Sequence, residues 1–144
     1  MSLEKPLYQG ERIKELIPQR FPIMMVDTLY EADETDCMTG LTISADNMFC
    51  QEGLFIEPGM IEHIAQSASA FAGVKAKMKN EPTPVGYIGE VKKFKLVSKP
   101  KTGDVLTTSI HTVSEVQNVS LIKAETKVGD CVVASCQMKI FIRE

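Results

Sequence analysis

The stretch PGMIEHIAQSASAFAGVKAKMK, residues 58–79, most constrains what this chain can fold into. Proline suits the first turn of a helix, where its missing amide donor costs nothing, and NEPTP at 80–84 ends the helical pattern. A helix of about 20 residues is about 30 Å long. From Met60 to Ala72 small and apolar side chains fall on every side, whereas a helix lying on one face of a sheet keeps a charged stripe. We therefore expect a central helix over about 58–79 that is enclosed on nearly all sides.

The rest of the chain has mainly the pattern of strands. ERIKELI at 11–17 indicates a short N-terminal helix, which Pro18 ends. Segments 23–32 and 37–44 form a hairpin pattern around the polar turn DETD. After the central helix, four alternating segments predict a four-stranded meander over 85–97, 105–116, 119–128 and 132–142. These elements make an α+β protein. A strongly curved antiparallel sheet wrapped around the central helix, the hotdog fold, provides the enclosure, and we expect one such domain over residues 1–144.

Composition and charge exclude several function classes. The chain has 144 residues, a formal net charge of −3 and a pI near 5.5, so it lacks the basic character of a nucleic-acid-binding protein. Its 4 cysteines lack CxxC spacing and it has only 2 histidines, which argues against a zinc site. No apolar run is long enough to span a bilayer, and we expect no signal peptide. We therefore expect a cytoplasmic protein with free thiols, and no metal, cofactor, nucleic acid or membrane span.

The first turns of the central helix carry the chemically notable residues Glu62, His63 and Gln66. The backbone amides near Gly59 and Met60 are expected to be free and to point, with the positive end of the helix dipole, at a bound carbonyl oxygen. Gln66 lies one turn after Glu62, so it either holds that carboxyl group or makes a structural hydrogen bond. Adjacent helical residues point about 100° apart, so Glu62 and His63 do not converge on one point within one subunit. His63 reaches a site with Glu62 across a dimer or after a rotation of the helix start, or it packs at the helix–sheet seam with a hydrogen bond to a carbonyl.

Four segments resemble the β-hydroxyacyl-[acyl-carrier-protein] dehydratases of the hotdog fold, in that family's order and at about its spacing. They are LIPQRFPIMMVD (16–27), PGMIEHIAQSA (58–68), YIGEVKKFKLVSKPKTGDVL (87–106) and KAETKVGDCVVASCQMKI (123–140). The resemblance covers nearly the whole chain. In that family a glutamate of the central helix and a histidine of the preceding loop do the chemistry across a dimer interface. Glu62 matches the glutamate, whereas Leu54 occupies the histidine position in the loop QEGLFIE (51–57).

The sequence is most similar to divergent members that keep the helix acid and lack the loop histidine, some of which pair with a histidine-bearing subunit. The resemblance implies a dehydratase-like protein of fatty-acid or polyene-type lipid metabolism that acts on thioesters of an acyl carrier protein or of coenzyme A. Eliminating water from a 3-hydroxyacyl thioester needs a base, an acid and donors for the thioester oxygen. The candidate catalytic residues are Glu62 and His63. The candidate oxyanion- and substrate-binding residues are Gly59, Met60, Gln66 and Leu54.

Two other functions are compatible with the same fold. One is an acyl thioesterase, because hotdog thioesterases use an acid of this helix without needing the loop histidine. The other is a non-catalytic partner subunit of a histidine-bearing hotdog dehydratase, and the replacement by Leu54 leaves open whether the chain is an enzyme by itself. We expect a homodimer or a higher oligomer of dimers, or a heterodimer with a histidine-bearing subunit, because pairing two sheets removes exposed edges.

Overall fold

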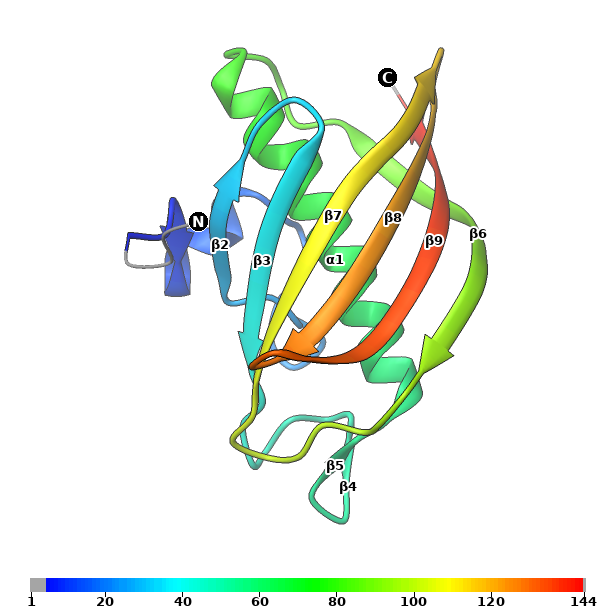
Figure 1. Ribbon diagram of the computed structural model, residues 1–144. Coiled ribbons are helices and arrows are strands. Elements are labelled where there is room, and N and C mark those ends of the chain that lie inside the picture. The colour runs from blue at the N-terminus through cyan, green and yellow to red at the C-terminus, as the bar shows by residue number, and fades with distance from the viewer. Residues whose placement is uncertain (1–4, 144) are drawn as a thin grey trace.

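The computed structural model describes residues 5–143, in which a curved antiparallel sheet wraps around one long helix (Figure 1). The helix, α1, runs over Glu57–Met78. In chain order the strands are β1 Tyr8–Gln9, β2 Thr28–Ala32, β3 Asp36–Thr42, β4 Cys50–Gln51, β5 Leu54–Phe55, β6 Val85–Leu96, β7 Val105–Val116, β8 Val119–Val128 and β9 Cys131–Arg143. The predicted α+β hotdog fold is confirmed. The prediction of one domain over the whole chain extends to residues 1–4 and 144, which lie outside the described residues.

The central helix is enclosed, as its composition predicts, and its observed bounds differ from the predicted 58–79 by one residue at each end. Its buried positions are Gly59, Met60, His63, Ile64, Gln66, Ser67, Ala68, Ala70, Phe71, Gly73, Val74 and Ala76. Gly73 marks a close approach of the N-terminal segment, since a Cβ atom there would lie 2.5 Å from the carbonyl oxygen of Leu16. The chain therefore passes directly over the helix backbone at this point. No helix within residues 5–143 is long and apolar enough to cross a lipid bilayer.

The N-terminal helix predicted at 11–17 is instead a 3-10 helix, η1, over Gly10–Glu15. The amide of Leu16 donates to the carbonyl of Ile13, three residues back, at 2.9 Å. The Arg20 guanidinium donates to carbonyl oxygens of this segment, so the last peptide groups bind a side chain and do not extend the helix. The apolar face of the segment is confirmed, because its three large aliphatic residues are buried: Ile13, Leu16 and Ile17.

The prediction of a four-stranded meander is wrong for β6, which does not pair with the strand that follows it in the sequence, β7. The strand order of the main sheet is β1-β2-β3-β7-β8-β9-β6, so β7 pairs with β3 and β6 pairs with β9 at the far edge. The link 97–104 runs past the β4–β5 hairpin (Figure 1), where the amide of Phe55 donates to the Pro100 carbonyl at 2.7 Å and that of Gly103 to the Ile43 carbonyl at 2.8 Å. Alternation identifies a strand but not its neighbour, and this link is too long for a tight hairpin turn.

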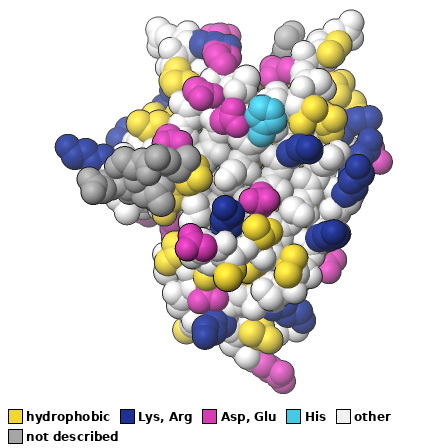
Figure 2. All heavy atoms as spheres, viewed as in Figure 1, with side chains coloured by type: hydrophobic (Ala, Val, Ile, Leu, Met, Phe, Trp, Pro, Cys, Tyr) yellow, Lys and Arg dark blue, Asp and Glu magenta, His cyan; other side chains and the backbone are white. Residues whose placement is uncertain are grey.

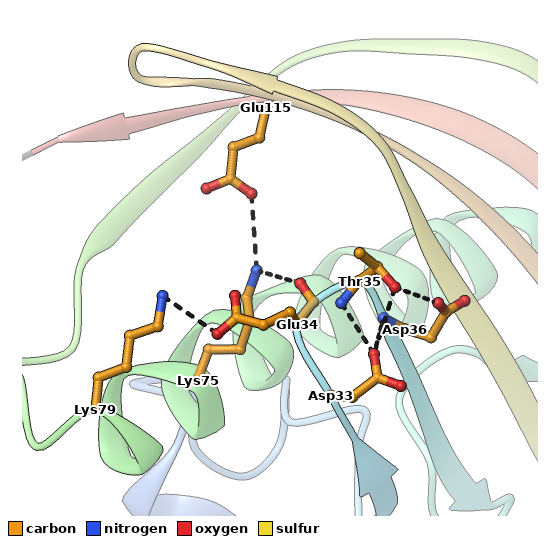
Figure 3. A network of polar contacts seen from close by, with 7 residues as sticks. All are labelled: Asp33, Glu34, Thr35, Asp36, Lys75, Lys79 and Glu115. Carbon is orange, nitrogen blue, oxygen red and sulfur yellow. Dashed lines mark hydrogen bonds and ion pairs between the residues drawn. The ribbon is translucent and has the colours of Figure 1, made fainter.

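The turn between β2 and β3 is the predicted polar turn DETD, shown in Figure 3. The Asp33 carboxylate accepts hydrogen bonds from the amides of Thr35 and Asp36 at 2.9 and 2.8 Å. These donors stabilise the charged form and hold the pKa of Asp33 below its ordinary value. The strand predicted at 37–44 is therefore present as β3, whereas the one predicted at 23–32 begins only at β2, five residues later than predicted.

The same turn docks on the C-terminal part of α1 through charged side chains (Figure 3). The Lys79 ammonium lies 3.5 Å from the Glu34 carboxylate of the turn. The Lys75 ammonium lies 3.8 Å from the Glu115 carboxylate of β7. Lys79 and Lys75 are thus neutralised by carboxylates of the β2–β3 turn and of β7.

We expect Gly73→Ala to lower the free energy of unfolding by about 1–3 kcal/mol, because the added methyl group would meet the Leu16 backbone. This sign is opposite to the gain of about 1 kcal/mol that the same change gives in an exposed helix. Urea unfolding followed by circular dichroism measures the effect. Ser69→Ala, at a partly exposed position of the same helix, is the control and should change stability little. Unchanged or higher stability of Gly73→Ala would contradict the close approach.

Candidate functional site

A layer of polar side chains crosses the interior between α1 and the sheet. Thr39, Thr108 and Thr126 are register neighbours on β3, β7 and β8, and each is 0% exposed. The hydroxyl oxygens of Thr108 and Thr126 lie 2.7 Å apart. Facing them, α1 presents His63 and Ser67, which are also 0% exposed. The Ser67 hydroxyl lies 2.7 Å from the Thr39 hydroxyl and donates to the His63 carbonyl at 2.8 Å, so the layer is satisfied by its own members.

His63 lies at the centre of this layer. Its Nδ1 is 2.7 Å from the Met25 carbonyl oxygen, and its Nε2 is 2.7 Å from the Thr108 hydroxyl. A carbonyl oxygen only accepts, so Nδ1 carries the hydrogen and Nε2 accepts from Thr108. Burial lowers the pKa of His63 from 6.5 to about 4, although the bond to Met25 acts in the opposite direction. At neutral pH His63 is therefore an uncharged imidazole with both nitrogens bonded.

Gln66 connects the same backbone segment to Glu62. Its side-chain oxygen accepts from the Met25 amide at 2.6 Å, and its Nε2 donates to the Ile23 carbonyl at 2.7 Å and to Glu62 Oε1 at 2.8 Å. Gln66 thus has both of the roles that the sequence allowed. The backbone of Met25 is held at its N–H by Gln66 and at its C=O by His63. These bonds take up the backbone groups of Met25, and the amides of Ile23 and Met24 donate to the Arg20 carbonyl, so the predicted strand does not begin at Ile23.

Glu62 and His63 leave the helix in different directions, as their adjacent positions predict. Glu62 is partly exposed, whereas His63 is fully enclosed. Both nitrogens of His63 are bonded inside the protein, so no hydrogen bond joins it to Glu62 within the chain. The structure brings Glu62 together with Gln66 and confirms the seam position of His63, with its hydrogen bond to a carbonyl. The catalytic assignments of Glu62 and His63 stay predictions.

The start of α1 is closely packed. A Cβ atom at Gly59 would lie 2.5 Å from Cβ of Phe49. The amides of Gly59 and Met60 donate to the Ile56 carbonyl at 3.0 and 3.2 Å. The expectation that these amides are free is therefore wrong, because the helix begins at Glu57 and the preceding carbonyl accepts both. Substrate binding by Gly59 and Met60 stays a prediction.

Leu54 lies apart from these groups, on the β4–β5 hairpin outside the main sheet. It is 41% exposed, and its backbone bridges to Lys101 in the link before β7. An aliphatic side chain neither donates nor accepts a proton. The hairpin position that the resemblance assigns to a histidine therefore supplies no acid or base in this chain.

The inward threonines are the residues that the sequence interpretation did not single out. Each stands at an inward position of an alternating strand, as Thr108 does between Leu106 and Ile110. A polar residue at an inward position needs a buried partner, which is the signal that would have found Thr39, Thr108 and Thr126. Their partner on the helix, by contrast, is not indicated by any spacing in the sequence.

The four cysteines are free thiols. Burial raises the pKa of Cys136 to about 11 and that of Cys37 further. The second histidine, His111, is on the surface, where its Nδ1 lies 3.0 Å from the Asp36 carboxylate. Within residues 5–143 no three His, Cys, Asp or Glu side chains are grouped so as to hold a metal ion.

Comparisons with known proteins agree with this fold. The model of the ApeP-like dehydratase family, described as ApeP dehydratase, matches residues 11–144. The 3-hydroxyacyl-[acyl-carrier-protein] dehydratase FabZ of Levilactobacillus brevis is 29% identical over 138 residues, 90% of each chain. FabZ of Clostridium botulinum strain Loch Maree is 31% identical over 137 residues, 90% of this chain and 92% of that one. Among solved structures, the dehydratase heterocomplex ApeI:P of Xenorhabdus doucetiae contains a chain with a TM-score of 0.84 and 14% identity, over 92% of this chain and 91% of that one, which shows the same fold.

We expect the stability of the protein to fall as the pH drops from 6.5 to about 4, because the unfolded histidine binds a proton in this range and the buried His63 does not. The pKa difference corresponds to about 3 kcal/mol of unfolding free energy, which is present above this range and lost within it. Urea unfolding at a series of pH values measures the slope, and His63→Gln should flatten it.

His111→Gln is the matched control for the pH series, because His111 is exposed and lies outside the buried layer. This variant should keep the slope of the wild type. Equal slopes for the wild type and His63→Gln would contradict a neutral, buried His63.

Proposed function

The chain belongs to the ApeP-like dehydratase family, and on this basis we propose that it is a 3-hydroxyacyl-[acyl-carrier-protein] dehydratase-like protein of fatty-acid or polyene-type lipid metabolism, in which Glu62 exchanges a proton with an acyl thioester. The observation that carries the proposal is the hydrogen bond from Gln66 to Glu62 at 2.8 Å. It fixes a carboxyl group near the start of the enclosed helix. Dehydration removes the C2 proton to a base and protonates the departing hydroxyl group, which leaves as water.

Gln66 supports this role because its own orientation is fixed. Its oxygen accepts from the Met25 amide, so its NH₂ group has to point toward Ile23 and Glu62. The bond occupies Oε1 of Glu62, and Oε2 has no hydrogen-bond partner within residues 5–143. One carboxylate oxygen is thus held by the protein and the other is left for a substrate proton.

The dehydration needs a second group that handles a proton, and within residues 5–143 neither Leu54 nor His63 supplies it beside Glu62. Leu54 is aliphatic, and His63 is bonded at both nitrogens inside the protein. We propose that a histidine-bearing hotdog subunit provides the group in a heterodimer. The structural neighbour from Xenorhabdus doucetiae is part of a dehydratase heterocomplex, which supports this assembly.

The edge strand β6 supports the same proposal. Within residues 5–143 its only neighbour in the sheet is β9, so the backbone groups of its other edge are open to a further strand. The exposed large apolar residues on and beside this edge are Val85, Tyr87, Ile88, Val91 and Phe141. Pairing of β6 with an edge strand of a second hotdog chain would cover them. A homodimer and higher oligomers use the same edge and belong to the same proposal.

The other two functions are not favoured. The family model and the curated relatives are dehydratases, not thioesterases. A non-catalytic partner subunit would have no need of the Glu62–Gln66 pair, whose geometry suits a proton-exchanging carboxyl group.

We expect Glu62→Gln to lower formation of the enoyl product by at least about 100-fold, because an amide cannot exchange the substrate proton. The assay mixes the chain with a histidine-bearing hotdog dehydratase subunit and a 3-hydroxyacyl carrier thioester, and follows enoyl product and free thiol together. Glu57→Gln, an exposed acid at the first position of the same helix, should keep the full rate. A wild-type rate for Glu62→Gln would contradict the proposal, and Glu62-dependent thiol release would indicate a thioesterase.

We expect the double variant Tyr87→Glu/Ile88→Lys to weaken subunit pairing at least about tenfold, because it places charges on the open edge of β6. Analytical ultracentrifugation over a concentration series measures the association, alone and with the histidine-bearing subunit. Val113→Lys/Val116→Glu changes two exposed apolar residues of β7, which β8 and β9 separate from β6 in the sheet, and serves as the control. Equal association of both double variants would show that the interface lies elsewhere.

A further inference from the structure

The edge of the sheet formed by β6 carries an excess of positive charge. β6 contains three lysines and one acidic residue, Glu90, and its neighbour β9 adds Lys139 and Arg143 without any acidic residue. The two strands together therefore have a formal net charge of +4, although the whole chain has a net charge of −3. Figure 2 shows Lys and Arg side chains along the margin of the molecule where β6 lies. The charge thus lies at an edge that is open to a further strand.

The single acidic residue of these two strands neutralises only part of their charge. The Lys92 ammonium lies 3.7 Å from the Glu90 carboxylate, and the Lys139 ammonium lies 4.0 Å from it. In the described part of the chain, Lys93 and Lys95 have no carboxylate within 4.0 Å, and both are exposed. We name these two residues the edge lysines. They are available for a counter-charge on another molecule.

The two halves of β6 differ in the kind of side chain that they expose. The first half, residues 85–91, exposes large apolar side chains: Val85, Tyr87, Ile88 and Val91. The second half, residues 92–96, contains all three lysines of the strand. Apolar side chains favour burial in an interface, whereas charged ones are favourable there only opposite a counter-charge. The first half therefore suits many partner strands, and the second half suits few.

The backbone of the second half is irregular. The pairing of β6 with β9 shifts register between Lys92 and Lys95, which is the signature of a β-bulge. Lys93 within it has φ 53°, a left-handed conformation that is unfavourable for a residue with a side chain. Lysine side chains and bulges are two features by which edge strands resist pairing with other edge strands. The second half of β6 has both, so it opposes the addition of an arbitrary strand.

A second copy of this chain is a poor partner for this half of the strand. In a two-fold symmetric dimer both subunits contribute the same surface, so two edges of net charge +4 would meet. The carboxylate that the second copy brings on β6 and β9 is that of Glu90, which already lies within 4.0 Å of Lys92 and Lys139. Like charges that face each other across an interface weaken it. The edge lysines therefore disfavour pairing of this edge with itself.

We propose that the edge lysines select the partner of β6, by favouring a hotdog chain whose edge strand carries carboxylates over a second copy of this chain. This inference rests on the heterodimer of the proposed function. The apolar first half supplies buried contact area, and the charges of the second half distinguish one partner from another. In an antiparallel pairing the second half of β6 lies beside the first half of the partner strand, so we expect the partner's acidic residues there. The charge pairs would be exposed, so added salt should weaken the preference.

The test needs only this chain and a charge-reversed form of it, Lys93→Glu/Lys95→Glu. Circular dichroism first establishes that the variant folds. It is then mixed in equal amounts with isotope-labelled wild type, and native mass spectrometry counts mixed dimers and homodimers after subunit exchange. We expect the equilibrium constant for forming mixed dimers from homodimers to exceed its statistical value at least about tenfold in dilute ammonium acetate, and to approach that value in concentrated ammonium acetate.

Lys123→Glu/Lys127→Glu is the matched control, because it changes net charge equally on β8, which β9 separates from β6 in the sheet. This variant should mix with the wild type in the statistical proportion. Statistical mixing of Lys93→Glu/Lys95→Glu would overturn the proposal, as would an equal excess of mixed dimers with the control or a mixture that stays monomeric.

A second measurement separates this inference from the proposed function. In analytical ultracentrifugation with the histidine-bearing subunit, Lys93→Glu/Lys95→Glu should associate at least about tenfold more weakly than the wild type, and the control should stay within about twofold. Equal association of the wild type and Lys93→Glu/Lys95→Glu would overturn the selection of the partner by charge. If both associations are as expected but no Glu62-dependent enoyl product forms, the proposed function is wrong and the selection by charge stands.

Discussion

The structure depends on matching polar groups between a helix and a sheet that together exclude water. A buried donor or acceptor without a partner costs about 1–3 kcal/mol, so His63 and Ser67 are tolerable only because inward threonines lie opposite them. Those threonines stand in register on neighbouring strands, which makes the layer a property of the sheet pairing. A shift of β7 by one residue would point Thr108 outward and leave the imidazole unpaired. The layer therefore fixes the register of β3, β7 and β8 against the helix.

The same layer fixes the position of Glu62. His63 and Gln66 bind the C=O and the N–H of one residue, Met25, and Gln66 also bonds the Glu62 carboxyl group one turn away. Buried hydrogen bonds thus connect the segment before β2, the first turns of α1 and the centre of β7. A carboxyl group that exchanges protons benefits from such a support, because its reach toward substrate is set by buried bonds and not by an exposed side chain.

Much of the fold could be predicted from the sequence, because its causes are local. The lack of a charged stripe from Met60 to Ala72 predicts an enclosed helix, and alternation together with a polar turn predicts six of the strands. The predictions that were wrong or missing concern contacts between segments far apart in the sequence. The neighbour of β6 depends on where the link 97–104 crosses, and the partner of His63 is a backbone carbonyl, which has no signature in the side-chain sequence. The prediction of free amides at Gly59 and Met60 was wrong for a different reason. The helix starts one residue earlier than predicted, and the carbonyl of Ile56 accepts hydrogen bonds from both amides.

In the dehydration that we propose, the different directions of Glu62 and His63 leave only Glu62 available to a substrate. A histidine that holds a backbone carbonyl and a buried hydroxyl at 2.7 Å cannot also move a substrate proton without giving up the bonds that hold the helix in place. The inward residue, His63, therefore stabilises the fold, and the outward residue, Glu62, is the one available for proton exchange. Since Leu54 adds no proton-handling group, the proposed dehydration takes the second one from another subunit, at the side where Glu62 is still partly exposed. β6, whose outer edge is unpaired within residues 5–143, is in contact with the same helix, so in the proposed heterodimer the partner strand would lie close to the helix that carries Glu62.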